Sequence, residues 1–286
     1  MNTRNIRIEG DGFKIKNFDT SPKRDIDKNT LEERLSQNIE ELALLQDILY
    51  AQDKYGVLVV IQAMDTAGKD GIIKHVMSGL NPQATQVHAF KQPSAEELDH
   101  TWLWKAHRYA PERGSIAIFN RSYYEEVLVV KVHNLLPKSK IPAVLYETDK
   151  IWDQRYEDIR DFERHLHRNG IEVVKLFLNI SKDEQKKRLL ERIDDKSKNW
   201  KFSDADLKER TFWGDYMKCY EDLINNTSTE KCPWYVIPSD KKKISRLMVS
   251  NILIEKLKEL NLKYPVLEKT KLKMLSTYKA DLLKEK

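Results

Sequence analysis

The sequence predicts an α/β fold in which helical crossovers connect the strands of a parallel sheet. Short apolar runs rich in β-branched residues alternate with longer segments in which apolar residues recur at every third or fourth position. Runs of the first kind are typical of strands buried on both faces, and segments of the second kind of amphipathic helices. Strands that alternate with helices favour parallel pairing through right-handed crossovers. Because the 286 residues carry no internal repeat and no long linker, we expect one domain, 1–286.

Composition limits the class of protein. A hydrophobic content of 40% with 33% charged residues is typical of a soluble globular chain, and no apolar stretch approaches the ~20 residues needed to span a bilayer. The first residues lack the apolar core of a signal peptide, and the two cysteines, Cys219 and Cys232, are too few for a disulfide framework. The net charge of +5 permits an anionic partner without requiring nucleic acid. We therefore expect a cytoplasmic protein that associates with neither nucleic acid nor membrane.

The first half of the chain begins with a segment in which apolar residues show no clear periodicity. Residues 1–30 are rich in Lys, Arg and Asp, and we expect them to form an extended arm on the domain. Apolar residues at helical intervals predict a helix over 31–53, and the run Val57–Ala63 predicts a buried strand, followed by a helix over Lys69–Leu80. The elements expected next are a strand at Gln86–Phe90, a helix from the Ser94 capping box to about Arg108, a strand at Ser115–Phe119 and a helix at Ser122–Val130.

The second half repeats this alternation. A helix is predicted over 143–168 because Gly170, a common residue just beyond a helix end, follows it, and Ile171–Asn179 is a predicted strand. A second capping-box pattern, SKDE at 181–184, predicts a helix that runs to about Ile193. The elements expected after it are a helix at Asp206–Asn225, a strand at Trp234–Ile237, a helix at Lys242–Leu260 and a helical tail at 263–286, beyond a core at 31–262.

A glycine-lysine pair follows the first predicted strand, in the stretch AMDTAGKDG. The phosphate-binding P-loop has the pattern G-x-x-x-x-G-K-[ST] between a strand and a helix, but here Ala63 replaces the first glycine and Asp70 the final hydroxyl residue. Gly68 allows close backbone approach, and Lys69 supplies a point charge to phosphates. The alternative is a tight turn with a solvated lysine. The residues expected to bind phosphate through this loop are Met64, Thr66, Ala67, Gly68, Asp70 and Gly71.

The departure at Asp70 bears on metal binding, because it removes the hydroxyl that usually holds magnesium. Asp65 inside the loop offers a carboxylate instead. Additional negative charge beside phosphates is expected only where a divalent cation lies between them. The departure therefore favours a metal-bridged polyphosphate.

A second motif, GSIAIFNRSYYEE, places Asn120 and Arg121 at the end of an apolar strand. P-loop enzymes usually carry an aspartate for the metal at this strand end, and Asn120 can offer only a neutral carbonyl oxygen. Arg121 is suited to bidentate recognition of phosphate. The alternative is a strand end followed by a surface arginine.

Five stretches together resemble the type-2 polyphosphate kinase family. They are AMDTAGKDG, LNPQA, FKQPSAEELDHTWLWK, IAIFNRSYYEE and KNWKFSDADLKER, and they occur in the family's order over roughly residues 10–262. The family's loop carries an aspartate where this chain has Asp65, and it tolerates Ala63 and Asp70. Asn120 in place of an aspartate is a variant that the family also contains.

The resemblance implies a P-loop kinase fold close to thymidylate and adenylate kinases, with three α/β/α layers, a central parallel sheet of five strands and a helical lid. It also implies reversible, Mg²⁺-dependent phosphoryl transfer from inorganic polyphosphate to nucleoside mono- and diphosphates, with Mn²⁺ as a substitute metal. AMP and ADP are the expected acceptors, and guanine nucleotides stay open. The long flanking helices suggest a homodimer or homotetramer.

In such an enzyme Lys69 and Arg121 clamp the transferred phosphate, and Asp65 and Asn120 hold the metal. The candidate lid is Ser181–Arg210, called the lid segment below, which carries many basic residues. An exposed helix with paired charges is the alternative, because acidic residues are interleaved with the basic ones.

Two arginines of the lid segment are expected to be catalytic. Arg188 and Arg192 are four residues apart and so share one helical face. Leu189, Leu190 and Ile193 are expected to face the core.

The acceptor nucleotide is expected to contact Phe90 and Lys91, which follow a strand end, and Glu126. Trp102 and Trp104 are expected to pack in the core or against another subunit. An ATP-dependent nucleoside monophosphate kinase stays open as an alternative, although Asp70 counts against it. A non-enzymatic polyanion-binding protein is the third hypothesis, and it would leave the loop unexplained.

Overall fold

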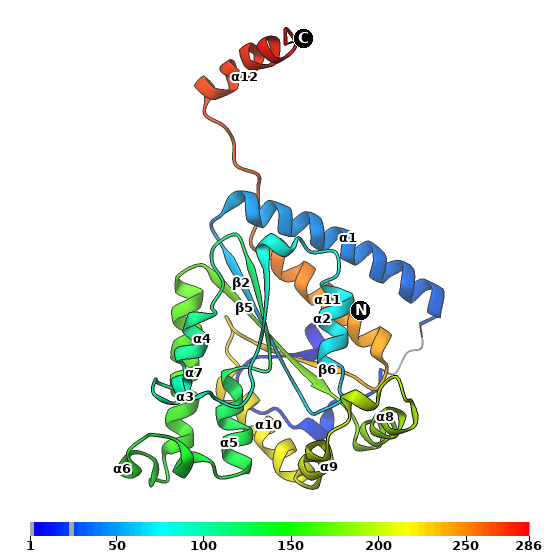
Figure 1. Cartoon of the computed structure of the whole chain (residues 1–286), viewed down its shortest axis with the longest axis vertical. Helices are drawn as coiled ribbons and strands as arrows, with labels where there is room; N and C mark the ends of the chain where they lie inside the picture. Colours follow the sequence, from blue (N-terminus) through cyan, green and yellow to red (C-terminus); the bar gives the residue numbers. More distant parts are fainter. Residues whose placement is uncertain (1–2, 23–25, 286) are drawn as a thin grey trace.

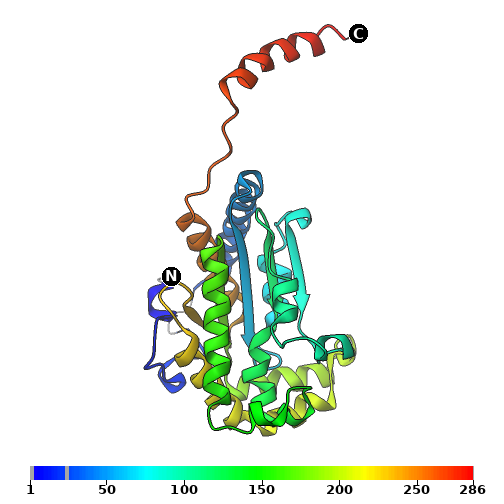
Figure 2. The ribbon, with the colours of Figure 1, turned by 90° about the vertical axis from the view of Figure 1, so that its left-hand side faces the viewer.

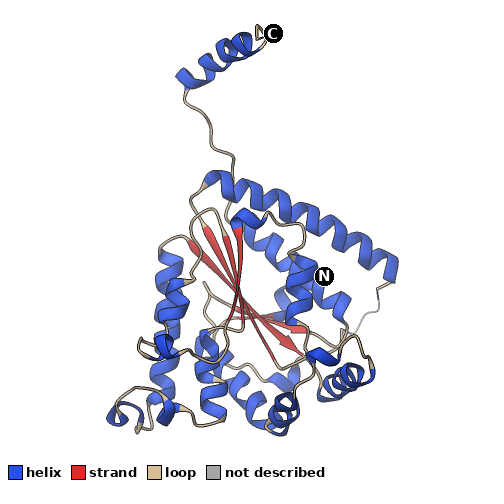
Figure 3. Ribbon diagram, viewed as in Figure 1, coloured by secondary structure: helices blue, strands red, loops and turns tan. Residues whose placement is uncertain are grey.

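A six-stranded sheet forms the centre of the structure, a computed structural model that describes residues 3–22 and 26–285 (Figures 1 and 3). Its strands lie in the order β1-β6-β5-β2-β4-β3. The five strands β2 to β6 pair in parallel, as predicted. The strand bounds are Arg7–Ile8 for β1, Gly56–Ala63 for β2, Thr85–Ala89 for β3, Ile116–Asn120 for β4, Ile171–Asn179 for β5 and Trp234–Pro238 for β6.

Helices cover both faces of the sheet. On one face α1 (Lys28–Gln52) and α2 (Lys69–Val76) pack against α11 (Lys242–Glu259). On the other face α7 (Ile151–Arg168) packs against β5, and α10 (Trp213–Thr227) packs against α7. Every residue of β2 and β5 is buried, because these strands lie in the middle of the sheet. The predicted three-layer α/β/α arrangement is therefore confirmed.

The prediction of a five-stranded sheet missed β1. This strand has only two residues, Arg7 and Ile8, and it pairs with β6 in the antiparallel sense. Two residues carry no readable alternation, so periodicity could not reveal it. The arm that contains it is held against the body further along, where Asn225 accepts a hydrogen bond from the backbone N–H of Phe13 at 2.7 Å.

Four helices were predicted as continuous but are interrupted in the structure. The apolar spacing reports which residues face the core, and it continues across a turn that breaks the backbone hydrogen bonds. The interrupted pairs are α3 (Ala95–Leu98) and α4 (Trp104–Arg108), η4 (Tyr123–Val127) and α5 (Val129–Val132), α6 (Ala143–Tyr146) and α7, and α9 (Asp204–Thr211) and α10.

The helix predicted over Lys69–Leu80 is shorter than expected, because α2 ends at Val76. Beyond its end the chain passes close to α1: a Cβ on Gly79 would lie 2.5 Å from the side chain of Ile39. The remaining elements are α8 (Lys182–Asp194), α12 (Lys269–Leu282) and the 3₁₀ turns η1 (Thr3–Ile6), η2 (Ile15–Asn17), η3 (Pro82–Ala84), η5 (Leu136–Lys138) and η6 (Asn199–Lys201).

A buried ion pair inside the core fixes the segment that follows β4. Lys175 of β5 is fully buried, and its Nζ lies 2.7 Å from a carboxylate oxygen of Glu163 on α7. The hydroxyls of Tyr123 and Tyr124 donate to the other oxygen of Glu163 at 2.8 and 2.7 Å. The pair of tyrosines therefore anchors the chain only two residues after Arg121.

The C-terminal helix α12 stands away from the rest of the molecule at the end of an extended linker (Figures 1 and 2). The helical tail predicted at 263–286 thus corresponds to α12 and its linker in the described part of the chain. None of the described helices has both the length and the apolar character needed to cross a membrane.

Candidate active site

The glycine-lysine loop joins the end of β2 to the start of α2, as the sequence predicts. Gly68 is the residue before the helix and has φ +116°, a region that glycine enters without the steric cost of a Cβ. Thr66 also has positive φ, at +64°, which is uncommon for a residue with a side chain. The loop therefore has the tight strand-to-helix geometry that turns backbone N–H groups and a helix N-terminus towards an anion.

Lys69 lies inside the loop, nearly buried. Its Nζ donates to the backbone carbonyls of Ala63 at 2.9 Å and Met64 at 3.3 Å. Burial lowers the pKa of Lys69, and the neighbouring Asp65 carboxylate opposes this shift. An ammonium group held within its own loop is a fixed positive charge for a phosphate at the loop mouth.

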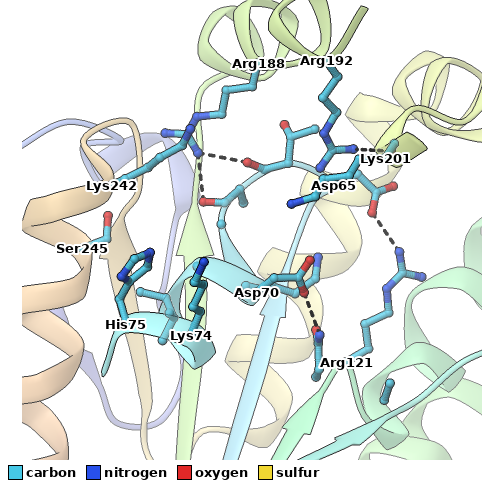
Figure 4. Close-up of a pocket in the computed structure, with 18 of the residues that line it drawn as sticks. Asp65, Asp70, Lys74, His75, Arg121, Arg188, Arg192, Lys201, Lys242 and Ser245 are labelled. Carbon is cyan, nitrogen blue, oxygen red and sulfur yellow. Dashed lines mark hydrogen bonds and ion pairs between the residues drawn. The ribbon is translucent and has the colours of Figure 1, made fainter. Parts of the chain in front are cut away.

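Two contacts join the loop to the end of β4 (Figure 4). Arg121 Nη2 lies 2.8 Å from Asp65 Oδ1, and Asn120 Nδ2 donates to Asp70 Oδ1 at 2.9 Å. Both contacts arise because β2 and β4 are adjacent parallel strands that end at the same edge of the sheet. The structure therefore brings together the two motifs that the sequence placed more than fifty residues apart.

Arg121 has a second carboxylate beside it that the sequence reasoning did not identify. Glu125 Oε2, in η4, lies 3.7 Å from Arg121 Nη1, four residues further along the chain. Burial raises the pKa of Glu125, and Arg121 offsets part of this shift. Arg121 itself has φ +61°, so the backbone is turned at the residue that carries the guanidinium.

Arg188 is engaged by the protein through all of its N–H groups. The side chain is buried, and Nε donates to Glu184 Oε1 at 2.8 Å. The two remaining nitrogens donate, at 2.8 to 3.1 Å, to four backbone carbonyls, those of Thr66, Ala67, Ser239 and Asp240. Arg188 thus holds the back of the phosphate loop against the end of β6. These contacts occupy every N–H group of the side chain, which favours a positioning role; the predicted catalytic role stays a prediction.

Arg192 is less constrained, and it lies over the loop on the same helical face (Figure 4). Its Nη1 lies 2.9 Å from Asp206 Oδ2 and 3.2 Å from the carbonyl of Lys201. These contacts tie α8 to η6 and α9 within the lid segment. The prediction that Arg188 and Arg192 face the same way is confirmed.

The opposite side of α8 differs from the prediction. Leu189 is buried as expected, but Leu190 and Ile193 are 48% and 46% exposed. A helix that lies at the rim of the molecule has only a narrow face towards the core. The capping box at its start is only half formed. Ser181 accepts from the backbone N–H of Glu184, but the Glu184 carboxylate binds Arg188, and the N–H of Ser181 donates to Asp240 instead.

A cleft of about 750 Å³ lies in front of the loop (Figure 4). It contains predicted residues from the loop, from the end of β4 and from the lid segment, including Lys198 and Lys201. Its other wall was missed by the sequence reasoning. That wall is made by Lys74, His75, Lys242, Ser245 and Arg246. The signal was available: the basic run at 241–243 follows directly after a strand, so it had to lie at the same edge of the sheet as the loop.

A second and larger cleft, of about 1560 Å³, adjoins the first. The two clefts share Phe90, Lys91, Gln92 and Arg121. Arg121 therefore lies where the two clefts meet.

The predicted nucleotide contacts lie on the wall of the second cleft, with two qualifications. Phe90 is mostly buried, its ring 4.7 Å from that of Phe119, whereas Lys91 is exposed. Glu126 faces Arg155, whose Nε lies 3.2 Å from its carboxylate, and burial raises the pKa of Glu126. Trp102 lies against Arg155, 5.0 Å from its guanidinium carbon, so this tryptophan lines the cleft as well as packing against the core.

The residues around the loop fit a hard divalent cation. Asp65, Asp70 and Asn120 place side-chain oxygen atoms along the rim of the first cleft. In the described part of the chain no group of three His, Cys, Asp or Glu residues is arranged to hold a metal by itself. Mg²⁺ does not require one, because it keeps several water ligands and is often bound by one or two carboxylates together with substrate phosphates. The hydroxyl of Thr66 in the same loop is buried without a hydrogen-bond partner, as expected where a bound anion would supply one.

Comparisons with known proteins agree with this geometry. Residues 25–265 match the family model of polyphosphate kinase 2 (PPK2). An ADP-polyphosphate phosphotransferase from Rhodopseudomonas palustris is 49% identical over 258 residues, which cover 90% of this chain and 89% of the relative. An AMP/ADP-polyphosphate phosphotransferase from Meiothermus ruber is 44% identical over 262 residues, which cover 91% of this chain and 94% of the relative.

Solved structures give the same result. The crystal structure of polyphosphate kinase 2 from Arthrobacter aurescens aligns with a TM-score of 0.86 at 38% identity, covering 96% of this chain and 95% of that one. A putative polyphosphate kinase 2 from Pseudomonas aeruginosa aligns with a TM-score of 0.77 at 28% identity, covering 86% of this chain and 50% of that one. The phosphate loop, the strand-end arginine and the P-loop kinase-like fold thus occur together in a chain that belongs to the polyphosphate kinase 2 family.

Proposed function

We propose that this protein transfers a phosphoryl group between inorganic polyphosphate and a nucleotide. The observation that carries the proposal is the meeting of two clefts at Arg121, one basic and in front of the phosphate loop, the other larger and partly aromatic. A transferase with two substrates needs such a junction, since donor and acceptor must align across one phosphoryl group.

The first cleft suits the polyphosphate chain. Basic side chains lie on both of its sides, from α2 and α11 on one wall and from the lid segment on the other. A linear polyanion makes contacts along its length, so a row of point charges is a better match for it than a single deep anion pocket. Asp65 and Asp70 are the carboxylates beside the loop, where a cation would separate them from the phosphates.

The second cleft suits the acceptor nucleotide. It is walled by aromatic and apolar residues such as Trp102 and Tyr123, together with Lys91 and Glu126. A nucleoside has an uncharged base and sugar and carries its charge at one end. Bound with its phosphate towards Arg121, it would leave the base among the aromatic and apolar side chains.

The chemistry asks little covalent work of the protein. Phosphoryl transfer is accelerated mainly by alignment and by neutralising the charge on the transferred group. Lys69 and Arg121 are placed for this, one inside the loop and one at the junction. Mg²⁺, or Mn²⁺ in its place, would be held by Asp65 and Asn120 and would supply further charge neutralisation. Ordering of the lid segment over the first cleft would exclude water, which otherwise consumes the donor by hydrolysis.

We infer that both mono- and diphosphates are acceptors. The R. palustris relative is named for ADP and the M. ruber relative for AMP and ADP, at similar identity to this chain. Because the second cleft, at about 1560 Å³, is larger than a single nucleotide requires, the acceptor phosphate has room for more than one position. We place the reaction in the cytoplasm, where these nucleotides occur.

The experiment compares donors and acceptors in one assay. The protein is incubated with Mg²⁺ and either long-chain polyphosphate or ATP, together with AMP, ADP, GMP or GDP, and the nucleotide products are separated by ion-exchange chromatography. We expect ADP and ATP to form from AMP and ADP only with polyphosphate. Formation of ADP from AMP with ATP as the sole efficient donor would instead identify a nucleoside monophosphate kinase. Binding without turnover of any pair would identify a polyanion-binding protein.

A further inference from the structure

Helix α12 presents an apolar stripe to solvent. Leu272, Leu275, Tyr278 and Leu282 recur at helical intervals, and these four side chains are between 47% and 65% exposed. Figures 1 and 2 show the helix well apart from the body in both views. A helix of 14 residues is only marginally stable by itself, so an amphipathic one this short normally depends on packing of its apolar face.

The tail lies outside the part of the chain that the family model matches. The match to the family model ends at residue 265, four residues before α12 begins. Both clefts are also formed without any residue of α12. The stripe therefore has a role other than completing the active site.

The charge of α12 disfavours pairing of two such helices. It carries four lysines, at 269, 271, 273 and 279, and a single acidic residue, Asp281. Lys271 and Lys279 lie one helical turn from members of the apolar stripe, so they share the surface that a partner would cover. Two copies of α12 face to face would bring these like charges together. An acidic surface is the better match for this helix.

The outer face of α1 is such a surface. Glu33, Gln37, Glu40, Leu44 and Asp47 follow one another at spacings of three or four residues, and all five are exposed. Leu44, at 56% exposed, lies among the acidic residues of this row. The row is called the outer α1 face below.

The acidic residues of α1 divide into two groups. Two of them that point towards the neighbouring helix are paired within the chain, Glu32 with Lys243 and Glu41 with Lys258. Glu33 and Glu40 of the outer α1 face form no ion pair within residues 3–22 and 26–285. The outer α1 face therefore combines acidic side chains that have no basic partner in the described residues with an exposed leucine. This surface complements α12, in which lysines lie beside exposed leucines.

The tail leaves the body next to this face. Tyr264, at the start of the linker, donates its hydroxyl to Asp47 at 2.6 Å, near the C-terminal end of α1. From there the linker carries α12 away from the chain's own α1 rather than back along it (Figure 1). A second chain related by a twofold axis would offer its own outer α1 face to this helix, and its tail would lie on the first chain in return.

We propose that α12 docks on the outer α1 face of a second copy of this chain, so that two chains exchange their tails. Apolar contact of the α12 stripe with Leu44 and its neighbours provides the attraction, and Lys271 and Lys279 against Glu33 and Glu40 set the direction of docking. The interface is isologous, since each chain contributes both surfaces.

Sedimentation velocity of the full-length chain over a range of concentrations tests the proposal. The wild type should form dimers of about 67 kDa, twice the chain mass of 33.7 kDa, or larger species built from them. Changing Lys271→Glu and Lys279→Glu together should weaken self-association at least tenfold. Adding Glu33→Lys and Glu40→Lys to that variant should restore it, because the charges are then exchanged across the interface.

Lys273→Glu is the matched control. It makes the same charge change on the opposite side of α12 and should leave self-association unchanged. All of these positions are exposed, so the melting temperature and the phosphotransferase activity of dilute protein should stay at wild-type values. Loss of activity with association intact would speak against the proposed function and not against the tail exchange.

Several results would overturn the inference. A monomeric wild type would show that the tail folds back or stays free, and an unchanged association constant in the double tail variant would show that another surface joins the chains. Failure of the four-residue charge exchange to restore association would exclude α1 as the acceptor. Co-sedimentation of the wild type with phosphatidylglycerol vesicles, lost in Leu275→Glu, would identify a membrane surface as the partner instead.

Discussion

Replacing Arg188 by methionine tests whether this residue holds the phosphate loop or contacts the substrate. The substitution keeps an unbranched apolar side chain in the buried position but removes five hydrogen bonds, one to Glu184 and four to backbone carbonyls. Two of those carbonyls belong to the loop itself. Arg188→Met should therefore lower both the stability of the protein and the rate of transfer.

The magnitude follows from the contacts. A hydrogen bond contributes roughly 1 kcal/mol net, and one that involves a charged group contributes roughly 1.5–3 kcal/mol. The bonds to Thr66 and Asp240 are only partly buried, so these two carbonyls can regain water, and we expect a total loss of about 3 kcal/mol. In a protein of this size each 1 kcal/mol changes the melting temperature by roughly 2–4 °C, which predicts a decrease of roughly 6–12 °C.

The effect on catalysis arises through the loop. A misplacement of about 1 Å in a phosphate-positioning element can reduce turnover on the order of 100-fold. We expect kcat to fall by that order at temperatures where Arg188→Met is still folded, with a smaller change in the KM for polyphosphate. Thermal unfolding followed by circular dichroism and initial-rate kinetics on the same sample measure the two effects.

Arg192→Met is the matched control, since Arg192 lies one turn along the same face with fewer contacts. It should lower the melting temperature by no more than about 2 °C, as is usual for a partly exposed ion pair, and should act mainly on the KM for polyphosphate. The reasoning would be refuted if Arg188→Met kept the wild-type melting temperature and kcat while the KM for polyphosphate rose. Arg188 would then be a substrate contact, as the sequence suggested.

Three further results are expected. Lys69→Ala should reduce kcat by ~10²–10³ with the fold intact, because it removes the fixed charge inside the loop; a variant that retained a tenth of the activity would contradict this. Asp65→Asn should raise the Mg²⁺ concentration needed for half-maximal rate, and an unchanged Mg²⁺ titration would place the metal elsewhere. The KM for long polyphosphate should rise steeply with ionic strength while that for the nucleotide changes little. Neutralising Lys242 and Arg246 together should make the KM for polyphosphate less sensitive to ionic strength. An unchanged sensitivity would mean that the polyphosphate leaves the loop along another wall of the cleft.

Much of the fold could be predicted because burial in a parallel sheet leaves a strong local signal. The central strands β2 and β5 are buried on both faces, and their bounds were predicted to within one residue. The short β1 and the breaks within helices could not be predicted, since the first depends on pairing with β6 and the second on backbone turns that apolar spacing does not record.

The candidate site was also predicted only in part. The loop and the strand end were found because each is a contiguous motif with its own chemistry. The basic wall from α2 and α11 was missed. The basic run at 241–243 was a signal for part of it, but Lys74 and Arg246 are ordinary helix residues until the fold brings them to one cleft. For Arg188 the local sequence gave the correct helical face but not the contacts, because the carbonyls that bind its side chain follow two distant strand ends.

The departure at Asp70 in the loop and the one at Asn120 at the strand end, finally, explain each other. An aspartate at the position of Asp70 beside an aspartate at the end of β4 would place two carboxylates about 3 Å apart, and such pairs resist ionising together. This chain has Asn120 at the strand end, and its amide donates to Asp70 at 2.9 Å. Asp70 and Asn120 together therefore add one negative charge to the rim of the cleft. A usual P-loop enzyme also has one negative charge there, from its strand-end aspartate. The negative charge lies on the first turn of α2 instead of on the strand, and Asp70 lines the cleft together with Lys74 and Arg121.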